Sequence, residues 1–85
     1  MGLALRTLKP AEKRESGITD GLVVEAVGGA AARSGLQLGD LLLAINGRPV
    51  TSAEQAGGLV ALSDKAAALL VQRGGTKIYV ALRLE

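Results

Sequence analysis

The chain has 85 residues, no cysteine, no histidine, one tyrosine as its only aromatic residue, and a formal net charge of +2. This length allows one domain with one small core. The lack of imidazole and thiol groups excludes a Ser-His-Asp or Cys-His nucleophile and the usual zinc sites, and we expect no cofactor. Weak charge and few aromatic side chains argue against nucleic-acid binding. No apolar run approaches the roughly 20 residues that span a bilayer, so we expect no membrane insertion.

The first third of the chain predicts a strand, a helix and a second strand. Residues 2–8 begin with leucines at alternate positions, which indicates a short strand. The polar residues 11–16 follow a proline and precede Gly17, so one or two helical turns are expected there. Residues 22–27 are mostly β-branched and apolar, which predicts another strand.

The middle of the chain predicts a helical turn and a central strand. Residues 30–34 suit a short helix that stops at Gly35. Residues 41–45 form a continuous apolar run of strand length, which we expect to be central and buried on both faces. The Asn46-Gly47 pair that follows predicts a tight turn, with residues 48–50 extended beyond it.

A longer helix is predicted from Ser52 to about residue 62. Gln55 stands three residues after Ser52, and this spacing is the capping-box pattern of a helix start. Gly57 and Gly58 lie in the helix interior, where each glycine costs about 0.8–1 kcal/mol relative to alanine. A helix weakened twice in this way suggests that missing side chains serve a purpose.

The end of the chain predicts a hairpin. Residues 67–73 and 76–84 flank a pair of glycines, and this turn sets Val71 opposite Ile78 and Leu69 opposite Val80. The elements together amount to five or six strands, one longer helix and one or two short ones. Such a set predicts an α+β fold, a partly open antiparallel β-barrel or sandwich capped by the helices.

The stretch from Gly29 to Val50 closely resembles the signature of the PDZ domain family. The signature residues are the run Ser34-Gly35-Leu36, the pair Gly39-Asp40, the apolar strand 41–45, the pair Asn46-Gly47, and Val50. The glycines permit turns and the leucines supply core, so these residues identify a fold rather than contact a ligand. The strand at the start of the chain is the bacterial arrangement of this family.

The polar insert from Lys9 to Ile18 and the last hairpin resemble the second, C-terminal PDZ domain of HtrA/DegP-type periplasmic serine proteases. This resemblance implies that residues 1–85 are a single PDZ domain excised from a longer parent chain located in the bacterial periplasm. It implies no catalysis by the domain itself. It implies instead a module that binds peptide C-termini or unfolded, extended segments by β-strand addition, either presenting substrate to the parent's protease domain or regulating that domain.

The resemblance also implies a binding groove between the first strand and the longer helix. Backbone amides near Leu3 would hold a terminal carboxylate, and Gly57 would open an apolar pocket for bulky C-terminal residues. Ala53 and Gly57 are expected to face the groove, and Ala56 and Val60 the core or the pocket floor. The expected peptide-binding residues are Gly2, Leu3, Ala4, Leu5, Arg6, Thr7, Ala53, Ala56, Gly57 and Val60.

Several alternatives remain open from the sequence. The domain could contact neighbouring subunits without binding peptide, or belong to a non-proteolytic secretion or scaffold protein. The first strand could be an ordinary edge strand, and Gly57 could reflect close packing against another backbone. Asp40 is expected to be a turn and capping residue. The basic cluster Arg6, Lys9, Lys13 and Arg14 is expected to be a solvated face.

Overall fold

The computed structural model describes residues 2–84, so Met1 and Glu85 of the expected domain lie outside the described residues. Within that range the chain forms six strands and three helices. The strands are β1 (Leu3–Thr7), β2 (Leu22–Val27), β3 (Leu41–Ile45), β4 (Arg48–Pro49), β5 (Ala66–Arg73) and β6 (Thr76–Arg83). The helices are α1 (Pro10–Ser16), α2 (Gly29–Arg33) and α3 (Ala53–Ala61). The predicted α+β class is confirmed.

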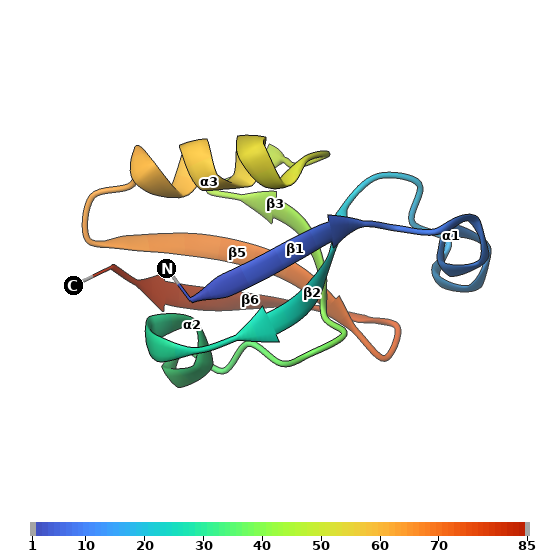
Figure 1. The fold of residues 1–85 in the computed structure, drawn as a ribbon, viewed down its shortest axis with the longest axis horizontal. Helices are drawn as coiled ribbons and strands as arrows, with labels where there is room; N and C mark the ends of the chain where they lie inside the picture. Colours follow the sequence, from blue (N-terminus) through green and yellow to red (C-terminus); the bar gives the residue numbers. More distant parts are fainter. Residues whose placement is uncertain (1, 85) are drawn as a thin grey trace.

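All strands belong to one antiparallel sheet with the order β1-β2-β3-β5-β6, and β4 pairs with β3. The sheet is open, with β1 and β6 as its edges. Figure 1 shows α3 along one side of the sheet near β3 and β5, α2 close to the start of β1, and α1 at the opposite end. The helices therefore cap the sheet as expected for a PDZ-like fold.

The core is aliphatic and is built from alternate residues of the paired strands. Val71 lies opposite Ile78 and Leu69 opposite Val80, which confirms the predicted hairpin register. The largest fully buried apolar side chains are Leu22, Leu42, Ile45, Leu69, Leu82, Val24, Val50 and Val71. Because successive strand residues point to opposite faces, this register directs one apolar row of the hairpin inward and leaves a mixed row of small, apolar and polar side chains on the other face.

The expectation that β3 is buried on both faces is wrong. Leu42 and Ile45 are fully buried, whereas Leu41, Leu43 and Ala44 are only half-buried. The pairing of β3 with β5 shifts between Leu42 and Ala44, so an extra residue lets two side chains three positions apart face the core. The opposite face of β3 is covered less completely, since α1 contributes no buried residue.

The helix ends follow local chemistry. The Ser52 side chain accepts a hydrogen bond from the Gln55 backbone N–H at 3.1 Å, as the capping pattern predicts. The reciprocal bond differs, because the Gln55 side chain accepts from the backbone of Thr51 at 2.8 Å instead of from Ser52. α1 ends at Gly17, whose φ of 72° lies in the left-handed region.

The turn between β3 and β4 is tied to two other elements through Asn46. Asn46 has a φ of 52° and its backbone N–H donates to the Ala68 carbonyl at 2.8 Å. Its side-chain oxygen accepts from the Ala68 N–H at 2.8 Å, and its Nδ2 donates to the Ser63 hydroxyl at 2.8 Å. Ser63 in turn donates to the Leu59 carbonyl at 3.0 Å. The turn therefore holds both β5 and the C-terminal end of α3.

Candidate functional site

β1 is an edge strand that offers one side to another polypeptide. Among residues 2–84 its only strand partner is β2. α3 lies beside β1, and Figure 1 shows β1 between α3 and β2. The unpaired edge of β1 therefore lies on the side of α3. An edge strand keeps unpaired backbone N–H and C=O groups, so this edge can accept an added strand.

The side chains of β1 divide between the core and solvent. Leu3 and Leu5 are half-buried and pack against the core cluster. Gly2, Ala4 and Thr7 are exposed. The edge of the groove therefore combines accessible backbone with two leucines that extend the core surface outward.

The residues of α3 differ in burial, and whether any of them faces a peptide stays a prediction. Ala56 and Val60 are buried in the core, whereas Ala53 is exposed and Gly57 is half-buried. A Cβ placed on Gly57 would meet no atom within 4 Å, so the space beside it is open. Close packing of Gly57 against another backbone is thereby excluded. The helix presents an uncovered stretch of backbone at this position.

Gly2 occupies a position that only glycine can fill. Its φ is +73°, and its carbonyl accepts a 2.7 Å hydrogen bond from the Gly28 N–H. A Cβ on Gly2 would lie 2.2 Å from the Gly28 carbonyl oxygen. Gly2 thus lets the chain enter β1 in close contact with the end of β2. The carboxylate-binding role of the amides that follow stays a prediction.

The Arg6 side chain is engaged on the other face of the sheet. Its guanidinium forms two 2.7 Å hydrogen bonds with the Glu12 carboxylate, and its Nε lies 3.0 Å from Glu25 Oε1. The hydrogen bonds from Arg6 and then from the Lys9 backbone lower the pKa of Glu12 to about 2. Arg6 is therefore not part of a simple solvated basic face. Its contribution to the groove is confined to its main chain.

Sequence reasoning missed this network because its members are brought together only by the fold. Glu12 lies on α1 and Glu25 on β2, while Arg6 lies on β1. Glu25 is passed over in the β1–β2 pairing, which shifts register after Ala4. The only sequence signal was the position of Glu12 in the first turn of a helix that directly follows the strand.

Two cavities border β1, and each is lined in part by one expected peptide-binding residue, Arg6 in the first and Gly2 in the second. One of about 440 Å³ lies beneath α1, and another of about 360 Å³ lies near α2 and the end of β6. Neither is lined by a residue of α3. The groove is thus a sheet edge facing a helix, a shape suited to an extended chain rather than to a compact small molecule.

Comparisons with known proteins agree with this architecture. The sequence profile of the PDZ domain family matches residues 23–73. The chain is 36% identical over 88 residues to a protein of Halomonas elongata named "Probable periplasmic serine endoprotease DegP-like". That match covers 99% of this chain and 18% of the relative. The chain thus spans less than a fifth of the curated relative's length.

Solved structures give the same assignment. The PDZ domain of HtrA3 bound to a phage-derived ligand (FGRWV) superposes with a TM-score of 0.83 at 26% identity, covering 98% of this chain and 81% of that one. The HtrA-type protease AlgW with a tripeptide superposes with a TM-score of 0.85 at 26% identity, and the match covers 96% of this chain and 29% of that one. The PDZ domain of EpsC from Vibrio cholerae superposes with a TM-score of 0.68 at 23% identity, and the match covers 96% of this chain and 93% of that one. This likeness shows a shared fold.

The open antiparallel sheet, the edge strand beside a capping helix and the matched profile over the central strands together define the class of domain. The chain belongs to the PDZ domain family. Its similarity to PDZ domains of HtrA- and DegP-type proteases confirms the predicted resemblance. As a PDZ domain it is a non-catalytic module. None of the helices within residues 2–84 has the length and apolarity to cross a membrane.

Proposed function

We propose that this PDZ domain binds the C-termini or extended segments of other polypeptides in the groove between β1 and α3. This proposal depends on one observation, the unpaired edge of β1 on the side of α3. A guest strand would complete the backbone hydrogen bonds of β1, and side-chain pockets would supply selectivity. The HtrA3 PDZ domain bound to a phage-derived ligand and the AlgW protease with a tripeptide support peptide binding by a similar domain.

The proposed specificity is for bulky apolar C-terminal residues. Leu3 and Leu5 extend the core surface beside β1, Val60 lies in the core, and Gly57 leaves open space in the wall of α3. A large apolar side chain would fill that space and remove apolar surface from water. Ala53 offers no hydrogen-bonding side chain, so a preference for Ser or Thr two residues before the terminus is not expected.

We propose further that the parent protein is a periplasmic HtrA/DegP-type serine endopeptidase and that this is its second PDZ domain. The similarity to the DegP-like relative supports the parent type. In such a chain the module would present unfolded segments to the protease domain or regulate that domain. A contact with neighbouring subunits that involves no peptide binding is the alternative role.

The decisive experiment is a titration of the 85-residue chain with peptides that differ only in the last residue. Calorimetry with peptides ending in Ala, Val, Leu and Phe should give dissociation constants on the order of micromolar for Leu and Phe. Amidation of the terminal carboxylate should abolish most of the binding. An equal response to all four peptides, or no response to any, would reject the groove as a selective C-terminus site and favour the assembly role.

A further inference from the structure

The cavity beneath α1 lies on the face of the sheet away from the core. Its volume of about 440 Å³ lies within the range of about 300–1,000 Å³ typical of ligand pockets. Its floor is a row of cross-strand neighbours, because Arg6 pairs with Val23, Val23 with Leu41, and Leu41 with Gln72. The middle of this row is apolar and its two ends are polar.

α1 is attached at both ends of this row and roofs the space between them. Glu12 binds Arg6 at one end, and the Gln72 side chain donates to the Ser16 carbonyl at 3.5 Å at the other. Surface helices normally bury an apolar stripe against the sheet that they cover. No residue of α1 is buried, and a cavity remains beneath the helix, although Val23 on its floor is itself buried and Leu41 is half-buried.

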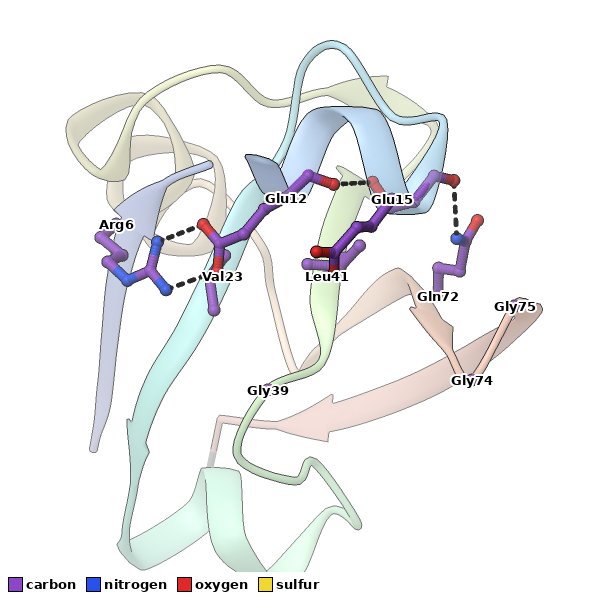
Figure 2. Close-up of a pocket in the computed structure, with 10 residues that line it drawn as sticks. Arg6, Glu12, Glu15, Val23, Gly39, Leu41, Gln72, Gly74 and Gly75 are labelled. Carbon is purple, nitrogen blue, oxygen red and sulfur yellow. Dashed lines mark hydrogen bonds and ion pairs between the residues drawn. The ribbon is translucent and has the colours of Figure 1, made fainter. Parts of the chain in front are cut away.

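A carboxylate is directed into the cavity. Figure 2 shows the Glu15 side chain extending from α1 toward Leu41 on the floor. The Glu15 side chain forms no hydrogen bond or ion pair with any of the residues 2–84. The Glu12 carboxylate, by contrast, is bound by Arg6 and by the Lys9 backbone N–H. The lining carries a net charge of −1 within a chain of net +2, and Lys13 is not part of it.

The wall opposite α1 is bare. Gly39, Gly74 and Gly75 line it, and a Cβ at any of them would meet nothing within 4 Å. The backbone of another chain can therefore approach this rim closely. The cavity thus combines an apolar strip in its floor, one solvent-exposed carboxylate that has no ion-pair partner among residues 2–84, and a rim of glycines.

We propose that this cavity receives a lysine or arginine side chain from a partner polypeptide. These are the side chains that join a long aliphatic stem to a cationic head. The stem would lie over Val23 and Leu41, and the head would pair with Glu15. The contact lies on a different face from the β1–α3 groove, so one domain can hold a peptide and this partner together, and neither depends on the other.

The test uses the ¹⁵N-labelled 85-residue chain and single-residue probes at constant ionic strength. N-acetyl-arginine methylamide and N-acetyl-lysine methylamide should cause saturable shifts of the amides of Val23, Leu41, Gln72 and Gly74. N-acetyl-norleucine methylamide, which has a stem without a charge, should cause little change. Equal shifts with norleucine, shifts confined to other residues, or no saturable shift would overturn the proposal.

Two substitutions at one position test the role of the carboxylate. Glu15→Gln should weaken the binding of the arginine probe by about two- to fivefold, as expected for loss of one exposed ion pair. Glu15→Lys should abolish the saturable amide shifts. Glu54→Gln removes an exposed glutamate from α3 and should leave the titration unchanged. Unchanged probe affinity in Glu15→Lys would refute the site, whatever the groove binds.

Discussion

The guanidinium of Arg73, at the end of β5, forms a bidentate ion pair with the buried carboxylate of Asp40. Nε lies 2.8 Å from Oδ1, and Nη2 lies 2.6 Å from Oδ2. Asp40 is 2% exposed and also accepts a 3.0 Å hydrogen bond from the Gln37 N–H. Arg73 donates as well to the Gly35 carbonyl at 3.0 Å. One ion pair therefore joins the loop before β3 to the end of β5.

Replacement of Asp40 by asparagine should destabilise the fold. Burial by itself raises the pKa of Asp40, but hydrogen bonds from Arg73 and Gln37 outweigh that effect and leave the pKa below its usual value. Loss of one charge from a buried pair should lower the free energy of unfolding by about 2–3 kcal/mol. Urea denaturation measures this change. Asp64→Asn, at an exposed position, is the control, and equal midpoints for the two variants would contradict the prediction.

The stability of the domain should fall in acid partly through Glu12. Its pKa is lowered from 4.5 to about 2 in the folded chain, first by the Arg6 hydrogen bonds. A carboxyl with a lowered folded pKa stabilises above its unfolded pKa and loses that effect as the pH falls through the folded pKa. The Glu12 contribution should therefore decline between about pH 4.5 and 2.

Glu12→Gln tests this pH dependence directly. Urea midpoints measured from pH 7 down to the acid limit should decline less steeply for Glu12→Gln than for the unmodified chain. Some decline should persist, because the pKa of Asp40 is also lowered. Glu54→Gln should keep the original slope. Parallel pH profiles for Glu12→Gln and the unmodified chain would mean that the Arg6 pair does not persist in solution.

Gly57 and Gly58 form a matched pair for testing the groove. A Cβ at either position would meet nothing within 4 Å, so alanine at each should stabilise α3 by about 0.8–1 kcal/mol. Gly57→Leu should also fill the proposed pocket and lower the affinity for peptides that end in Leu or Phe by at least about tenfold. Gly58→Leu should leave their affinity unchanged. Calorimetry that gives equal affinity losses for both leucine variants would reject Gly57 as the pocket opening.

Gly2 and Gly17 provide a second matched pair. Their φ values are 73° and 72°, but only Gly2 has a backbone oxygen, 2.2 Å away, where a Cβ would be placed. Gly17→Ala should lower the free energy of unfolding by about 1 kcal/mol, through the strain of a left-handed backbone alone. Gly2→Ala should cost more and should also weaken peptide binding by displacing the start of β1. Thermal denaturation and peptide titration together measure both effects. Equal stability losses with unchanged peptide affinity would show that the start of β1 does not shape the groove.

Local features of the fold could be predicted from sequence because neighbouring residues encode them. The Ser52 cap, the end of α1 at Gly17 and the register of the β5–β6 hairpin each depend on a few adjacent positions. The buried pattern of β3 could not be predicted in the same way. It depends on an irregularity at Leu43 and on a covering helix that has no buried residue.

The candidate groove was predicted mainly through family resemblance. Alternating leucines indicate a strand, but no residue pattern states that β1 lies at an edge or that α3 faces it. The pairs between Arg6 and Glu12 and between Arg73 and Asp40 were missed for a related reason. A charged residue in a sequence has many possible partners, and only the completed sheet selects one.

The hydrogen bonds of Asn46 help to fix the position of α3. Its C-terminal end is anchored through Ser63 to the β3–β4 turn and to β5. Its N-terminal end is held by contacts of Gln55 with residues immediately before the helix. Both ends of α3 are thus tied to the sheet, which fixes the distance between α3 and β1 before any guest chain arrives. A peptide that enters the proposed groove would therefore spend little of its binding free energy on ordering the helix.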